Sequence, residues 1–142
     1  MTTVIDFEDV FNNSYKRILG SSTSRENDFF DYFYELFIGS SPLVEEKFLD
    51  VNMAAQKMML KQSLIHLLNM FATKRIPDGL DDIAAKHSRK GADIPPSLYQ
   101  NWLECLLATV KKFDPRYNDE VELAWRMICS QGIAFMTFKY ER

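Results

Sequence analysis

The chain has little cysteine and no cysteine motif. Cys105 and Cys129 stand alone, without a CxxC pair, so the sequence predicts neither a disulfide framework nor a zinc site. We expect both to be core thiols of a protein in a reducing cytosol.

Long apolar runs and a basic block are missing as well. No segment approaches the ~18 uninterrupted apolar residues of a membrane span, and residues 1–20 carry acids at Asp6, Glu8 and Asp9 instead of the apolar run of a secretory signal. The net charge is −3, with lysine and arginine scattered among the acids, whereas nucleic-acid binding needs a one-sided basic surface. We therefore expect a cytoplasmic protein that binds neither nucleic acid nor a membrane.

Strand signals, internal repeats, low-complexity tracts and domain linkers are also absent, whereas helical periodicity runs nearly throughout. The sequence predicts an all-α class and a single domain, 1–142. Six or more helices of unequal length favour an irregular packing around something over a symmetric four-helix bundle. The expected helices cover about residues 7–19, 25–37 (capped by Ser24), 42–48, 51–71, 80–90 (ended by Gly91), 95–113 and, from 118 or 119, at least to 136.

Two polar residues interrupt otherwise apolar helical stripes. Gln56 lies one turn before Leu60, and since an unsatisfied buried amide costs roughly 1–3 kcal/mol, it is either a boundary residue that reaches solvent or a loop carbonyl, or a donor over a bound ligand. His87 shares its stripe with Ile83 and is either a satisfied core histidine or a metal ligand. One histidine suffices for haem iron, whereas zinc needs three or four ligands. His66 points away from the stripe of its helix and is expected at the surface. The 11 phenylalanines suit a pocket for a flat ligand and equally a small helical core.

An ordered set of segments resembles bacterial globins over roughly residues 5–140. The segments given below resemble, in chain order, three parts of a bacterial globin: the second helix with the corner after it, the distal helix, and the proximal-histidine segment. In that last segment a glycine commonly follows the histidine by four residues. The set consists of residues 33–38 with Pro42 and Phe48, residues 52–56 with Leu60, residues 85–91, Tyr99, the helix through Leu107, and Trp125.

The resemblance implies a globin-like fold of six to eight helices around haem b, iron protoporphyrin IX. His87 would be the proximal iron ligand, Phe48 would pack flat on the haem, and Leu60 would form the apolar distal wall. Ile83 and Tyr99 complete the implied cofactor-binding set, with Tyr99 near the proximal side.

The resemblance also places Tyr34 and Gln56 in the distal pocket, a pair similar to that of flavohaemoglobins and related single-domain bacterial haemoglobins. A shift of one residue would turn Phe33 inward instead, although the spacing from Pro42 to Phe48 favours Tyr34. The O–H of Tyr34 and the N–H of Gln56 would stabilise the partial negative charge of dioxygen on ferrous haem, which implies high oxygen affinity and slow release.

The chain departs from flavohaemoglobins in two places. The segment between Gly91 and Tyr99 looks longer, and the late glutamate beside the proximal histidine is replaced by Tyr140, with Glu141 one residue on. The hydrogen bond that this glutamate would make to His87 is therefore expected to be weaker or absent. We expect no flavin and nicotinamide reductase domain.

The function implied by the resemblance is reversible binding of dioxygen or another diatomic ligand (NO, CO), with oxygen transport as one use. One alternative is nitric oxide dioxygenase, which detoxifies NO and would need a separate reductase as partner. A second is a gas sensor acting in trans, and a third is a haem-free interaction module. A monomer or homodimer is expected.

Overall fold

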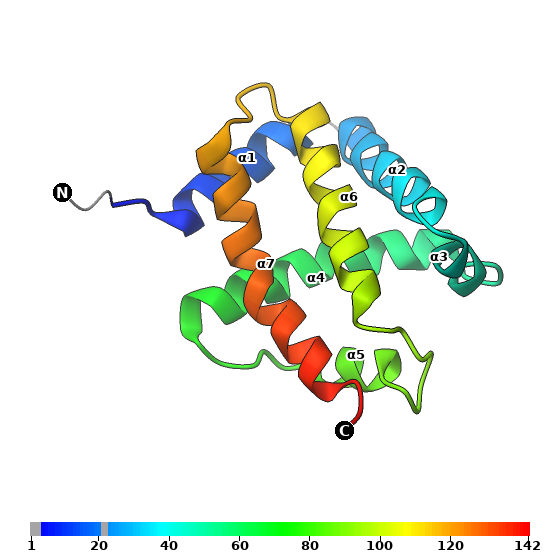
Figure 1. Cartoon of the computed structure of the whole chain (residues 1–142). Coiled ribbons are helices and arrows are strands. Elements are labelled where there is room, and N and C mark those ends of the chain that lie inside the picture. Colours follow the sequence, from blue (N-terminus) through cyan, green and yellow to red (C-terminus); the bar gives the residue numbers. More distant parts are fainter. Residues whose placement is uncertain (1–3, 21–22) are drawn as a thin grey trace.

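The computed structural model describes residues 4–20 and 23–142, and in these residues every regular element is a helix, which confirms the predicted all-α class (Figure 1). The helix lengths are as unequal as predicted, from 6 residues in α3 to 21 in α4 and α7. The elements are α1 (Phe7–Leu19), α2 (Thr23–Gly39), α3 (Pro42–Lys47), α4 (Met53–Thr73), α5 (Leu80–His87), α6 (Ser97–Phe113) and α7 (Asp119–Lys139).

Side-chain caps explain where several helices begin. The Asp6 carboxylate accepts a hydrogen bond from the N–H of Asp9 at 3.0 Å, which satisfies a donor that the first turn of α1 leaves free. Three further helices begin with an equivalent N-cap, in which the side chain accepts a hydrogen bond from the N–H three residues on. These caps are Ser41 at α3, Asn52 at α4 and Asn118 at α7. The predicted cap of α2 is wrong: α2 begins at Thr23, so Ser24 already lies within the helix. The expected break after α1 begins at Gly20, the C-cap, and its remaining residues, 21–22, lie outside the described ones.

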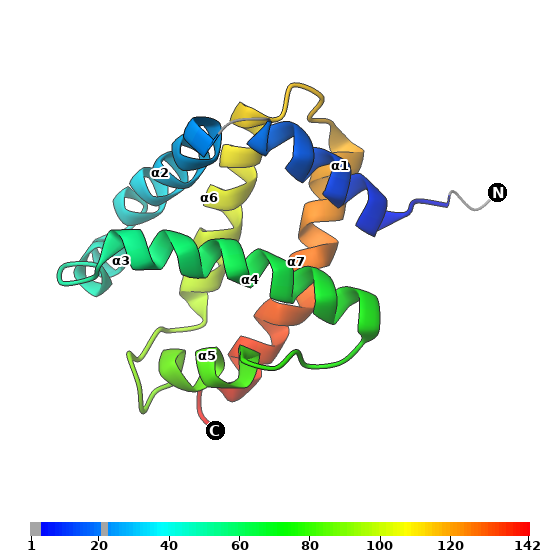
Figure 2. The same ribbon diagram turned by 180° about the vertical axis from the view of Figure 1, so that it is seen from behind.

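The helices enclose a region bounded by α4 and α5 on one side and by α6 and α7 on the other. Figure 2 shows α4 crossing in front of α6 and α7, with α5 below it near the end of the chain. Helix α1 packs on α7, and α2 packs on α6 (Figure 1). None of the described helices is long and apolar enough to cross a membrane.

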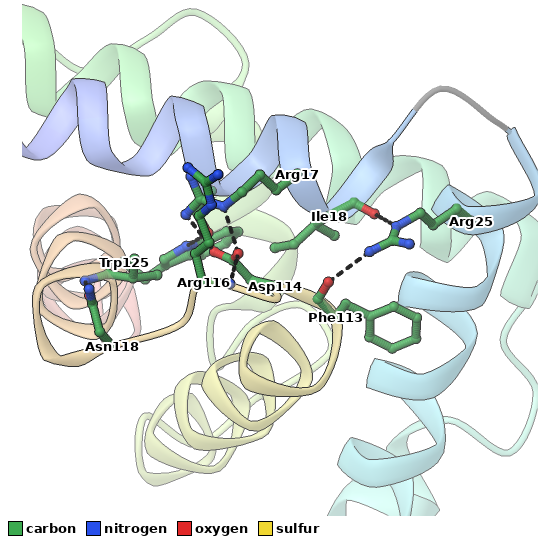
Figure 3. Close-up of polar contacts among 10 residues, drawn as sticks. Arg17, Ile18, Arg25, Phe113, Asp114, Arg116, Asn118 and Trp125 are labelled. Atoms are coloured by element: carbon green, nitrogen blue, oxygen red, sulfur yellow. Dashed lines mark hydrogen bonds and ion pairs between the residues drawn. The ribbon is translucent and has the colours of Figure 1, made fainter.

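A buried polar network joins the first helix to the last (Figure 3). The Ser14 hydroxyl donates to Asp114 at 2.7 Å and accepts from the indole N–H of Trp125 at 2.9 Å. Arg17 adds two hydrogen bonds to the same carboxylate, at 2.7 and 2.9 Å. Because Phe11 packs on Trp125 with ring centroids 4.5 Å apart, the junction combines apolar burial with directional bonds.

The two thiols differ in burial. Cys129 in α7 is fully buried, as expected, but Cys105 in α6 is only half-buried. The expectation of two core thiols is therefore wrong for Cys105, because this position lies at the edge of the buried face of its helix.

Candidate functional site

A largely apolar cavity lies between α4, α5, α6, α7 and the corner formed by α2 and α3. The centre of a water-sized sphere can occupy about 150 Å³ of it, whereas one water needs roughly 10–15 Å³ by this measure. The structure brings every site residue predicted from the sequence to this one cavity: Tyr34, Phe48, Gln56, Leu60, Ile83, His87 and Tyr99.

Other lining residues were missed by the sequence reasoning, among them Lys47, Met59, Ser63, Trp102, Gly132 and Met136. Helical periodicity indicates which face of a helix is buried, but not whether that face meets another helix or a cavity. Gly132 did carry a signal, because glycine inside a helix costs roughly 0.5–1 kcal/mol relative to alanine. A Cβ at Gly132 would lie 2.0 Å from Cδ2 of Leu67, so the glycine permits the close approach of α7 to α4 beside the cavity.

His87 is the last residue of α5, and its hydrogen bond fixes its tautomer. Nδ1 lies 2.8 Å from the backbone oxygen of Ile83. Since a carbonyl only accepts, Nδ1 carries the proton and Nε2 keeps a free lone pair. Burial lowers the pKa of His87 and the nearby Lys86 lowers it further, against the opposing effect of the Ile83 carbonyl, so the neutral ring is favoured. The side chain is thus a neutral nitrogen donor on the wall of the cavity.

The segment after His87 folds back onto the end of α5. The N–H of Ala92 donates to the oxygen of Lys86 at 2.8 Å, and that of Ile94 donates to the oxygen of His87 at 3.0 Å. Gly91 makes this possible, because a Cβ there would lie 2.4 Å from the Lys86 oxygen. Gly91 was expected to end the helix, but α5 ends four residues earlier and the glycine serves the close approach instead.

The end of the chain holds the same segment. The N–H of Arg89 donates to the backbone oxygen of Tyr140 at 2.9 Å, and the Tyr140 hydroxyl donates to the Asp93 carboxylate. The Arg89 guanidinium also pairs with Glu141 at 3.4 Å. Tyr140 therefore binds the segment that follows His87, while the imidazole itself is bonded to a neutral carbonyl.

On the opposite wall, Tyr34 and not Phe33 lines the cavity. Phe33 is fully buried against other aromatic rings, including that of Trp102 at a centroid distance of 6.2 Å. The Tyr34 hydroxyl donates to the backbone oxygen of Gln56 at 3.1 Å. Phe48 lies next to it, with ring centroids 5.8 Å apart.

His66 is half-buried rather than at the surface, where the sequence had placed it. Its ring faces Gly79, in the loop before α5, where an added Cβ would lie 3.9 Å away. It is not among the residues that line the cavity. In the described ranges no group of three histidine, cysteine, aspartate or glutamate side chains comes together to hold a metal ion.

The comparison with solved structures gives a clear relative. A crystal structure of a Pseudomonas aeruginosa protein, described as structurally highly homologous to a human haemoglobin, matches 96% of this chain and 100% of its own with a TM-score of 0.86 and 34% sequence identity. No protein-family model matches the chain, and no curated protein does. Identity at this level over nearly the whole chain, together with the ordered segments and the helical fold, shows that the chain belongs to the globin family.

Proposed function

We propose that this globin binds haem b in the cavity and, through the haem iron, reversibly binds a diatomic gas such as dioxygen, NO or CO. The globin fold implies a haem cofactor. The observation that carries the proposal is the protonation of His87. Its proton lies on Nδ1, which bonds the Ile83 oxygen, so Nε2 has a free lone pair that can bind a metal. One such donor is what haem iron takes from a globin chain.

The residues that line the cavity support haem binding by their chemistry. Its walls are mostly apolar, and Phe48 and Leu60 offer an aromatic ring and an aliphatic side chain to a flat ligand. Lys47 also lines it, with its ammonium 3.0 Å from the backbone oxygen of Ala92. This cation supports binding of the propionate carboxylates of a haem.

When bound, the haem supplies an iron with a coordination position for the gas. The chain supplies the rest of the site. His87 offers a neutral imidazole nitrogen, the apolar walls exclude water, and Gln56 places an amide in the same cavity. We propose that these groups favour a small neutral gas over a charged ligand, because a charge in an apolar cavity is poorly solvated.

Absorption spectra of the purified protein test the proposal. We expect a Soret band that shifts on reduction and again on addition of CO, and a pyridine haemochrome spectrum of haem b. His87→Ala should lose haem retention, whereas the matched variant His66→Ala should keep it, since His66 lies outside the cavity lining. A colourless protein that refuses added haemin would refute the proposal, and full haem in His87→Ala with unchanged spectra would refute the role of His87.

A further inference from the structure

The Tyr34 hydroxyl is already engaged in the structure. A tyrosine has one hydroxyl proton, and Tyr34 gives it to the backbone oxygen of Gln56 at 3.1 Å. The ring is nearly buried and held by Phe33 and Phe48, at centroid distances of 4.9 and 5.8 Å. While this bond is made, the proton is not available to a ligand in the cavity.

The Gln56 side chain completes the arrangement. This side chain lines the same cavity as the Tyr34 phenol, and its proximity works against the rise in the pKa of Tyr34 that burial causes. A glutamine amide has two N–H donors. Because Gln56 lines the cavity, the amide can direct an N–H to a ligand there.

We propose that Tyr34 is a positioning residue that holds Gln56 through its backbone oxygen, and that the Gln56 amide is the hydrogen-bond donor to the gas. This inference rests on the proposed function and assigns the donor role within it. Tyr34 then slows gas release only through Gln56, and its hydroxyl does not contact the gas.

A double-mutant cycle on haem-loaded protein separates this arrangement from two independent donors. The variants are Tyr34→Phe, Gln56→Leu and the double variant, and the quantity is the dioxygen dissociation rate constant from stopped-flow mixing. Loss of one such hydrogen bond is expected to raise the rate about tenfold in Gln56→Leu. Tyr34→Phe should raise it less, and the double variant should match Gln56→Leu. The matched control is Tyr32→Phe, which removes a hydroxyl from the same helix outside the cavity lining and should leave the rate unchanged.

Two results of the cycle would overturn the proposal. If Tyr34→Phe speeds release as much in the Gln56→Leu background as in the native one, Tyr34 donates to the gas directly. If Gln56→Leu leaves release unchanged, the amide is not the donor. The carbon–oxygen stretching frequency of the CO-loaded variants should follow the same pattern, because it senses donors beside the gas.

Hydrogen exchange of the haem-free protein tests the positioning role without any gas. The α-helical pattern pairs the Gln56 oxygen with the N–H of Leu60, so this carbonyl belongs to the first turns of α4. Tyr34→Phe should accelerate amide exchange in that part of α4 several-fold relative to Tyr32→Phe. Equal exchange in the two variants would overturn the proposal. Failure to bind haem would refute the proposed function instead, and this measurement would still decide the role of Tyr34.

Discussion

Asp114 is almost inaccessible to solvent and receives hydrogen bonds from three groups: the Arg17 guanidinium, the Ser14 hydroxyl and the backbone N–H of Arg116. Burial alone would raise the pKa of this carboxyl. The three donors together outweigh burial and hold its pKa below the usual range. The charged form is therefore the one that the folded protein favours.

Asp114→Asn should destabilise the protein, because the neutral amide leaves the partly buried Arg17 guanidinium without its ion pair. We expect the free energy of unfolding in urea at pH 7 to fall by about 3 kcal/mol. The control is Asp31→Asn, which removes an exposed ion pair with Lys57 and should cost much less. Equal losses in the two variants would contradict the role given to Asp114.

The same carboxyl makes stability depend on pH. Because its folded-state pKa lies below the unfolded value, its contribution is complete above the unfolded pKa of about 3.9 and is lost as the pH falls from there through the folded-state value. Wild-type protein should thus lose stability below about pH 4 more steeply than Asp114→Asn. Urea titrations between pH 6 and 3 measure this, and parallel curves for the two proteins would rule it out.

At the scale of the elements, the position of α5 depends on what surrounds its end. Gly91→Ala would push a Cβ against the backbone oxygen of Lys86, and a backbone atom cannot move aside as a side-chain tip can. We expect a loss of about 1–3 kcal/mol in the free energy of unfolding and, with His87 as the proposed iron ligand, faster haem loss. The matched variant Gly39→Ala meets nothing within 4 Å and should be neutral or slightly stabilising. Tolerance of Gly91→Ala would mean that the turn after α5 relaxes freely.

The end of α7 provides a second restraint on that segment. Tyr140→Phe removes the hydroxyl that binds Asp93 while keeping the ring and the backbone bond from Arg89. Haem transfer to an excess of an apoglobin acceptor should become several-fold faster, with little change in overall stability. Tyr117→Phe is the control, since that hydroxyl bonds Glu122, outside the cavity lining. Equal rates for both variants would show that the contact with Asp93 does not restrain the segment after His87.

At the scale of the whole molecule, the two thiols report opening of the fold. Burial raises the pKa of Cys129 to about 12, so this thiol is both protonated and inaccessible at pH 8. Half-buried Cys105 should react first with a thiol reagent, and Cys129 only when α7 leaves the core. In Cys105→Ser, labelling of Cys129 should therefore follow the global unfolding rate measured in denaturant. Labelling faster than unfolding would reveal local opening of α7.

Much of the fold could be predicted from the sequence, because amphipathic periodicity and helix-start residues such as Pro42 and Asn118 act locally. The predicted starts agreed with the structure to within a residue for α1, α3 and α7, were two residues early for α4 and α6, and were wrong at Ser24, which lies within α2. For the choice between Tyr34 and Phe33, the spacing from Pro42 to Phe48 favoured Tyr34, and Tyr34 does line the cavity. Which of the two lines it depends on how α2 turns against α6, where Trp102 packs on Phe33.

The cavity itself was only partly accessible to sequence reasoning. Its histidine and glutamine stand out because they interrupt apolar stripes, and all the predicted lining residues do meet there. Lys47 and Met136 carry no such mark, since a lysine after two glutamates and a methionine in an apolar helix look ordinary in sequence. Their position follows from the crossing of distant helices.

The junction at Asp114 also has a consequence for synthesis of the chain. Ser14 and its carboxylate partner are 100 residues apart, and the indole of Trp125 is 111 residues from Ser14. At translation rates of about 5–20 residues per second, α1 leaves the ribosome roughly 5–20 s before the residues that cover it. During that interval Phe11 lacks its contact with Trp125, although the contacts of α1 with α2 can already form. Helix α1 therefore completes its packing only after α7 has been made.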